Sequence, residues 1–406
     1  MNKIELLAPA GDMNKLKTAF YFGADAVYVG GKSFSLRAQA GNFTDEELEE
    51  ATIFAHGLNK KIYVTVNIFA RNFDLEKAKD YFIFLEKIGV DGAIVSDTGL
   101  LCIAKKYAPS LTLNLSTQAN TLNYETVKFW HDFGVKRVIL ARELSLKEIT
   151  EIHEKVPSVE IETFVHGAMC ISYSGRCMLS DYRTGRQSNR GGCVQACRWN
   201  YEIREKGSNG AFMEMEEDDR GTYILNSKDL CLIDYVSELD KAGVVSFKIE
   251  GRMKSEYYIA TVINAYRRAI DAYYNLGASY KDSGEFLVEV QKTAHREFTT
   301  AYLLGENDRT ENFDDSQSKG THKYIASVIE DFNGEYALIE MRNRFMVGDE
   351  LEILSPSKIF NEIIKVDKMT DEKGVNILDA KIVQQKIRLY TNMPLKKGDI
   401  LRIVQK

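Results

Sequence analysis

The sequence has little of what marks disordered, secreted or membrane-spanning chains. Only five prolines occur among its 406 residues, which argues against long disordered linkers. The opening stretch MNKIELLAPAGDMNK has neither the apolar core nor the cleavage site of a signal peptide. No uncharged apolar run approaches the ~20 residues that cross a bilayer. We therefore expect a globular cytoplasmic protein, with no membrane partner, whose cysteines stay reduced.

Familiar catalytic motifs are missing as well. The chain has no H-E-x-x-H helix of a zinc peptidase and no G-x-S-x-G turn of a serine hydrolase. The paired C-x2-C spacing of a zinc ribbon does not occur either. The net charge is −6, so any nucleic-acid-binding surface must be local.

What the sequence does have is a regular alternation of strand-like and helix-like segments over its first ~250 residues. Thr44 and Glu47 fit a capping box at the start of one of these helices. Alternation of this kind predicts βα units and a parallel sheet. The expected strands are 4–8, 26–30, 61–67, 91–97, 111–117, 135–141, 159–167, 222–226 and 244–251. That number favours a (β/α)8 TIM-barrel-like domain over a six-stranded doubly wound sheet.

The pattern changes twice along the chain. A long interruption at about 168–221 is expected to be an insertion in the barrel domain of residues 1–280. Residues 281–320 are expected to connect the barrel domain to the C-terminal domain. From 321 to 406 the sequence alternates apolar and polar residues, with a hairpin signal at Asn333-Gly334, which predicts a small all-β barrel domain. Such domains bind RNA in some proteins and only pack in others, and both roles stay open.

Polar residues follow many of the predicted strands. In parallel α/β folds the carboxyl ends of the strands form the active-site face. Any single polar residue after a strand can also be explained as a strand exit or a helix cap. The whole set of such residues is therefore stronger evidence for an active site than any one of them. The candidate catalytic residues are His166, Lys228, Asp229, Lys248 and Glu250. The candidate substrate-binding residues at these positions are Arg37, Asn67, Gln118 and Arg252.

The insertion opens with the stretch CISYSGRCMLSDYRTGRQSNRGGCVQACRWN, which holds four of the six cysteines. Thiolates suit zinc or iron–sulfur clusters, and redox-active cysteines are a third alternative. The irregular spacing favours an iron–sulfur cluster held between loops, with zinc as the alternative. Cys170, Cys177 and Cys193 are the expected ligands, and Cys231 is preferred over Cys197 as the fourth. Cys102 lies in an apolar helix and is expected to be buried.

The same stretch is rich in arginine. Arg176, Arg183, Arg186 and Arg198 are predicted to bind anionic substrate groups, and solvated surface is the alternative for each. Tyr173, Tyr182 and Trp199 would either stack on bases or pack the loop against the barrel.

The stretch ETFVHGAMCISYSGRCMLS (162–180) resembles the signature of the peptidase U-32 family, whose members were first called collagenase-like proteases. LLAPAGD, NRGGCVQACRW, NSKDLC and FKIEGRMKSEYY also match habitual stretches of that family. The resemblance implies a [4Fe–4S] cluster and RNA hydroxylation that uses prephenate rather than molecular oxygen. A barrel with one β domain at this length is most similar to the branch that makes 5-hydroxyuridine at the tRNA wobble position.

This resemblance sets the expected partners and the alternatives. The substrate would be a tRNA anticodon stem-loop, and a related family paralogue is a further expected partner chain. A U-32-type peptidase, a ribosomal RNA cytidine hydroxylase and a non-catalytic RNA-binding factor are the competing interpretations. His166 lies near Cys170, so a Cys–His nucleophile fits the peptidase alternative, but a metal-bound thiolate is not free to attack.

Overall fold

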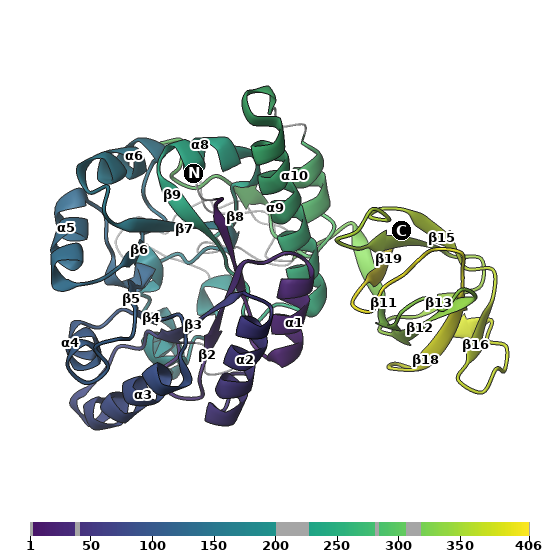
Figure 1. Ribbon diagram of the computed structural model, residues 1–406, viewed down its shortest axis with the longest axis horizontal. Coiled ribbons are helices and arrows are strands. Elements are labelled where there is room, and N and C mark those ends of the chain that lie inside the picture. Colours follow the sequence, from purple (N-terminus) through teal and green to yellow (C-terminus); the bar gives the residue numbers. More distant parts are fainter. Residues whose placement is uncertain (1–2, 37–40, 200–226, 281–283, 306–317, 406) are drawn as a thin grey trace, which may run out of the picture.

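The computed structural model describes residues 3–36, 41–199, 227–280, 284–305 and 318–405. Eight parallel strands form a closed barrel, because β7 and β9 pair with each other and β9 pairs with β1. This confirms the predicted (β/α)8 fold (Figure 1). The barrel strands are β1 (Glu5–Pro9), β2 (Ala26–Gly30), β3 (Lys61–Val66), β4 (Gly92–Val95), β5 (Leu113–Leu115), β6 (Arg137–Ile139), β7 (Glu160–Ala168) and β9 (Val244–Ile249).

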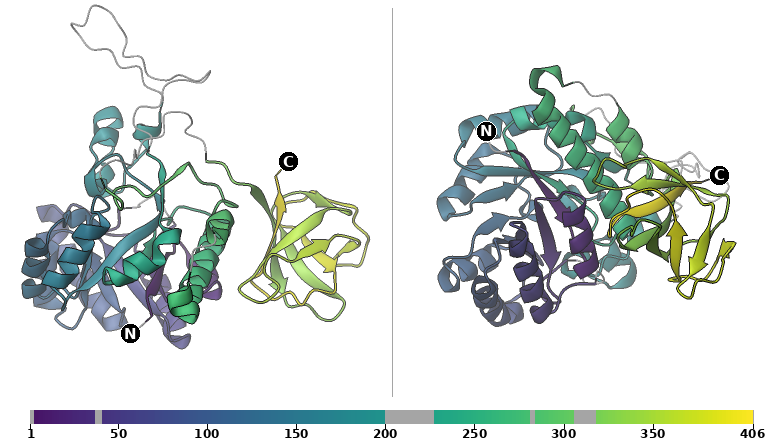
Figure 2. Two further views of the ribbon diagram at one scale, coloured as in Figure 1. Left: turned by 90° about the horizontal axis from the view of Figure 1, so that it is seen from above. Right: turned by 45° about the vertical axis from the view of Figure 1, so that its right-hand side comes forward.

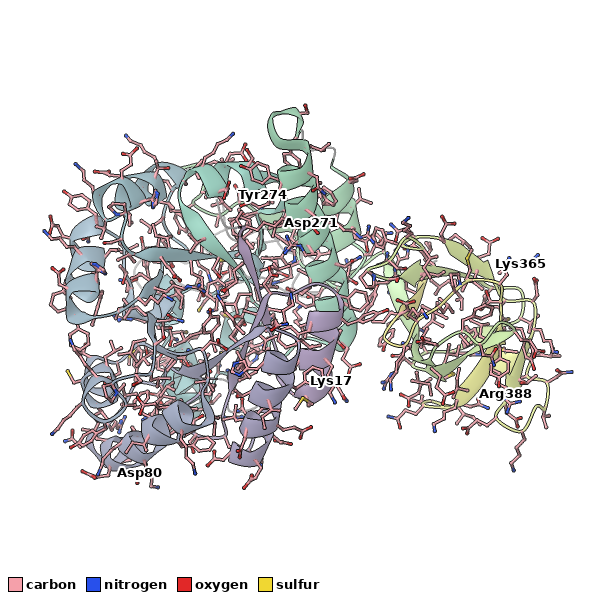
Figure 3. All side chains as sticks on the ribbon, viewed as in Figure 1. Lys17, Asp80, Asp271, Tyr274, Lys365 and Arg388 are labelled. Carbon is pink, nitrogen blue, oxygen red and sulfur yellow. The ribbon has the colours of Figure 1, made fainter. Side chains whose placement is uncertain are left out.

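Amphipathic helices surround the barrel and bury their apolar faces against it. Lys17 on α1 and Asp80 on α3 point outward, away from the strands (Figure 3). The predicted capping box is confirmed: Thr44 N donates to Glu47 at 2.7 Å, and Glu47 N donates back to Thr44 Oγ1 at 3.1 Å. The helices are α1 (Met13–Tyr21), α2 (Asp45–Gly57), α3 (Leu75–Ile88), α4 (Thr98–Tyr107), α5 (Tyr124–Phe133), α6 (Leu146–Lys155), α8 (Val236–Lys241) and α9 (Glu256–Leu276).

One strand lies outside the closed ladder. β8 (Asp229–Cys231) pairs antiparallel with the end of β7, and β10 (Phe298–Thr299) extends the sheet beyond it. Ala168 is the cross-strand neighbour of Asp229. The chain between these two residues, called the cysteine-bearing segment (169–228) below, therefore leaves and rejoins the barrel at one point. Cys231 therefore ends a strand. The predicted strand 222–226 falls outside the described residues.

The described part of the cysteine-bearing segment is built from short turns and one short helix. It lies at the end of the barrel opposite the N-terminus (Figure 2). Its elements are η3 (Tyr173–Gly175), α7 (Leu179–Thr184), η4 (Ser188–Arg190) and η5 (Ala196–Arg198).

The C-terminal domain is all-β, as predicted. A seven-stranded antiparallel sheet has the order β15-β14-β19-β11-β12-β18-β16 and encloses its own apolar core. Gly334 has φ +102°, a left-handed value that favours glycine, in the turn between β11 and β12. The strands are β11 (His322–Glu330), β12 (Tyr336–Met341), β13 (Phe345–Met346), β14 (Glu350–Leu354), β15 (Ile363–Lys365), β16 (Met369–Asp371), β17 (Asp379–Ala380), β18 (Lys386–Tyr390) and β19 (Ile400–Val404).

A buried ion network fixes the β domain against α10 (Glu285–Val290). Arg402 is fully buried and pairs with Glu289 at 2.7 Å and with Glu352 at 2.6 Å. Lys292 also reaches Glu352 at 2.8 Å. Since these charges come from both domains, the β domain has one preferred position beside the barrel (Figure 1). Within the described residues, no helix is long and apolar enough to cross a membrane.

Candidate active site

A cavity of about 440 Å³ opens at the carboxyl ends of the barrel strands. Its volume lies within the range of small-molecule sites. The loop after β3 contributes Asn67, the turn after β5 contributes Gln118, and β9 and its exit contribute Lys248, Glu250 and Arg252. The structure thus brings together five residues that the sequence singled out separately.

Four thiols border this cavity: Cys170, Cys177, Cys193 and Cys197. Cys231 does not line it. The Cys231 side chain is buried beside Tyr266, and burial raises the pKa of its thiol to about 12. The geometry therefore favours Cys197 over Cys231 as a companion of the other three, which reverses the preference drawn from the sequence.

Two of these thiols interact directly. A hydrogen bond from Cys170 lowers the pKa of Cys177 to about 5, and the same bond, with burial, raises the pKa of Cys170. The backbone N–H of Leu179 also donates to Cys177 Sγ at 3.3 Å. Cys102, which was expected to be buried, is exposed on α4.

The four thiols do not form a ready-made site for a single ion. Among the described residues, no three His, Cys, Asp or Glu side chains converge closely enough to hold one metal ion. Tetrahedral zinc needs its sulfurs within ~2.3 Å of one centre. In a [4Fe–4S] cluster each thiolate binds its own iron, so the sulfurs lie further apart. The four thiols therefore share the cavity wall without surrounding one metal position among the described residues.

Lys248 is the most buried charge on the cavity wall. Its ammonium donates to Glu162 at 2.7 Å and lies 4.5 Å from the Tyr28 ring centre. Burial lowers the pKa of Lys248, and Glu162 opposes this shift. Glu162 also accepts from Arg137 at 3.1 Å, which in turn pairs with Glu5. An interior ion network therefore holds the lysine in place.

Arg252 is held by three neutral oxygens. Its guanidinium donates to Ser35 Oγ at 2.8 Å, to Thr65 Oγ1 at 2.9 Å and to Asn42 Oδ1 at 2.7 Å. These bonds fix the position of the guanidinium on the cavity wall.

The sequence interpretation missed two charged residues, Arg142 and Glu143, which lie three and four residues after the end of β6. Arg142 stacks 3.9 Å above the Phe164 ring and lies 3.9 Å from the Glu250 carboxylate. Glu143 accepts from the backbone N–H of Ser174 at 2.8 Å, which ties the cysteine-bearing segment to the barrel. Both occupy the strand-end position that identified Asn67, so the same signal was available.

Lys254 and Arg198 complete a cationic side of the cavity. Burial lowers the pKa of both groups, because their charges lie in low-dielectric surroundings. Together with Arg252 and Arg142 they outnumber the lining carboxylates of Glu143 and Glu250. The wall therefore favours an anionic ligand.

Three predicted catalytic residues lie away from this cavity. His166 is buried among the rings of Tyr266 and Phe298, and burial lowers its pKa to about 3. Asp229 forms a buried ion pair with Arg296 at 2.6 Å, and Lys228 pairs with Glu297 at 2.8 Å. These contacts are structural ones.

The predicted substrate-binding arginines divide into two kinds. Arg176 donates to the backbone carbonyl of Gln118 at 2.7 Å, so it supports the cavity wall. Arg183 and Arg186 lie on exposed parts of the segment, beside Tyr182, which is 85% exposed. Arg37 lies outside the described residues.

The fold and the site together define a (β/α)8 barrel protein with a cysteine-lined cavity and an appended β domain. The model for Peptidase family U32 matches residues 11–312, and the model for the Peptidase family U32 C-terminal domain matches residues 320–402. The chain therefore belongs to peptidase family U32.

Relatives within this family carry different names. "tRNA hydroxylation protein P1" of Bacillus subtilis is 42% identical over 98% of this chain and 95% of its own length. A 23S rRNA 5-hydroxycytidine synthase of Escherichia coli is 36% identical over 74% of this chain but only 45% of its own length. "Collagenase" of Porphyromonas gingivalis is 30% identical over 96% of this chain and 98% of its own length.

Proposed function

We propose that this protein hydroxylates RNA, and specifically that it converts the wobble uridine of tRNA to 5-hydroxyuridine. The observation that carries the proposal is the near full-length match to relatives named for tRNA hydroxylation, which are 36–42% identical to this chain. The ribosomal RNA enzyme is the second candidate, but this chain spans less than half of it.

The proposed cofactor is a [4Fe–4S] cluster held by Cys170, Cys177, Cys193 and Cys197. Their shared position on the cavity wall supports this choice. A cluster of this kind supplies one-electron chemistry when it is bound. The lowered pKa of Cys177 suits a metal ligand, because metals bind the deprotonated form.

The proposed hydroxyl donor is prephenate, used without molecular oxygen, as the family resemblance implies. Its carboxylates suit the cationic side of the cavity, where Arg252 and Lys254 lie. In this proposal Arg252 binds a carboxylate, and Lys248 with Glu250 orients the reacting groups. A wall that carries more cations than carboxylates supports such a ligand.

The proposed path for the RNA crosses the exposed part of the cysteine-bearing segment. Arg183 and Arg186 would contact phosphates, and Tyr182 would stack on a base of the single-stranded loop. Because the whole chain is acidic, this local basic surface would select the docking position.

Mass spectrometry of tRNA nucleosides from a deletion strain tests the function. We expect loss of 5-hydroxyuridine and its derivatives, and recovery when the gene is restored. Unchanged levels, with every family paralogue also deleted, would refute the proposal. Loss of 5-hydroxycytidine from ribosomal RNA would instead support the second candidate. Co-purification with a paralogue tests the expected partner chain.

The peptidase alternative predicts a different result. Casein cleavage by anaerobically purified protein, abolished in Cys170→Ala, would support it. Iron and sulfide analysis of the same preparation tests the cofactor, and zinc at one ion per chain without iron would contradict the cluster.

A further inference from the structure

Gln118 lines the cavity and carries an unpaired hydrogen-bond acceptor. It lies on the turn η2 (Thr117–Ala119) directly after β5, and its side chain is 8% exposed. Its Oε1 is buried and accepts no hydrogen bond from any residue that the structure describes. A buried acceptor without a hydrogen bond costs free energy of folding and is uncommon in proteins. We therefore expect a ligand in this cavity to donate a hydrogen bond to it.

The backbone of Gln118 is fixed before any ligand arrives. Its N–H donates to Ser116 Oγ at 3.3 Å, and its carbonyl accepts from Arg176 Nε at 2.7 Å. Asn120, at the end of the turn, accepts from Ser174 Oγ at 2.9 Å. Contacts from both the barrel and the cysteine-bearing segment therefore preorganise this position.

A glycine leaves room beside the amide. Gly175 has φ +76°, and a Cβ built there would stand 3.7 Å from Gln118 Nε2. Gly175 precedes Cys177 by two residues, so the amide lies next to the segment that carries the thiols. A ligand group held by the amide is thereby close to the proposed cluster site.

We infer that the Gln118 carboxamide reads the Watson–Crick edge of the target base and selects uracil; this inference rests on the proposed function. Oε1 accepts the N3–H of uracil while Nε2 donates to O4. Cytosine has an acceptor at N3, which would oppose Oε1 in the observed amide orientation. The reacting carbon of uracil is C5, which is bonded to C4 and makes no contact with the amide in this arrangement. These two hydrogen bonds therefore leave C5 accessible.

Binding of two RNAs to the full-length, anaerobically purified protein tests the inference. One anticodon stem-loop carries uridine at the wobble position, and the other carries 3-methyluridine, which lacks the N3–H. The wild-type protein should bind the second RNA about ten- to a hundredfold more weakly. Gln118→Leu should bind both RNAs with the same reduced affinity, and its visible cluster absorbance should be unchanged.

Gln195→Leu is the matched control, because Gln195 lines the same cavity but is exposed. It should keep the wild-type preference for uridine. Equal wild-type affinity for the two RNAs, or a preference that survives in Gln118→Leu, would overturn the role of Gln118 alone. If the wild-type protein binds neither RNA, the proposed function fails and this inference fails with it.

Discussion

Replacing Glu162 with glutamine is the sharpest test of the interior ion network. Glu162 is 1% exposed and neutralises Lys248, whose side chain is 4% exposed. Glutamine keeps the shape but leaves the ammonium buried without an anion. Lys248 avoids that penalty by losing its proton. The working pH of 7 lies roughly 3.5 units below the ordinary lysine pKa of 10.5, and deprotonation costs about 1.4 kcal/mol for each of these units. The expected loss of stability is therefore at most about 5 kcal/mol, in line with ~3–5 kcal/mol for breaking a buried pair.

The pH dependence of this loss has a definite sign. In the variant the unfolded chain binds the Lys248 proton and the native state does not, so stability rises with pH up to 10.5. The deficit relative to wild type should shrink by about 1.4 kcal/mol for each pH unit above 7. Urea unfolding at pH 7, 8 and 9, followed by intrinsic fluorescence, measures it.

Glu160→Gln is the control on the same strand. Glu160 also pairs with Arg137, at 2.8 Å, but its side chain is 34% exposed. Arg137 keeps Glu5 and Glu162 in that variant, so the loss should stay below about 1 kcal/mol. Equal losses in the two variants, or a Glu162→Gln deficit that does not change with pH, would refute the reasoning.

Three further predictions concern the thiols and the domain interface. Cys197→Ala should lose iron and visible absorbance, whereas Cys231→Ala should keep both and lose about 1 kcal/mol of stability; the opposite pattern would restore Cys231 as the ligand. Arg402→Met removes one of the two cations that pair with the buried carboxylates of Glu289 and Glu352, since Lys292 still reaches both, and should cost about 1.5–3 kcal/mol in urea unfolding. A loss below about 1 kcal/mol would show that this network does not hold the domains together. Glu352 has its pKa lowered to about 2 by His322, Arg402 and Lys292, against the desolvation that opposes them. The ionised Glu352 carboxylate stabilises the fold by on the order of 3 kcal/mol above pH 4.5, and this stabilisation is lost as pH falls towards 2. The melting temperature of Glu352→Gln should therefore fall less steeply between pH 4.5 and pH 2 than that of the wild type. Parallel plots of melting temperature against pH for the two proteins would contradict this.

Local signals in the sequence were enough to predict the architecture. The Thr44–Glu47 capping box and the Asn333-Gly334 turn form from residues close in sequence, and both are present in the structure. The strand-end signal also pointed to Lys248 and Glu250, and both line the cavity because β9 runs up to it. Features that depend on neighbouring residues alone were therefore predictable.

The errors in the site arise from pairing between distant segments. On β7, simple alternation puts His166 on the same face as Phe164, which lines the cavity. The register between β7 and β9 shifts between these two residues, and His166 packs instead against Tyr266 of α9. Asp229 ends up away from the cavity because β8 runs antiparallel outside the barrel. Neither the shift nor the reversed strand leaves a local sequence signal.

The cross-strand contact between Ala168 and Asp229 makes the barrel independent of the segment between them. The barrel closes through β7 and β9 without residues 169–228, so its ladder does not depend on what joins the two ends. Lengthening a loop whose ends already meet costs only about 0.6 kcal/mol for each doubling. Segments of different length and charge can therefore be exchanged at this junction on an unchanged scaffold. A chimera that carries the corresponding segment of the ribosomal RNA enzyme would retain the barrel while presenting a different surface to RNA.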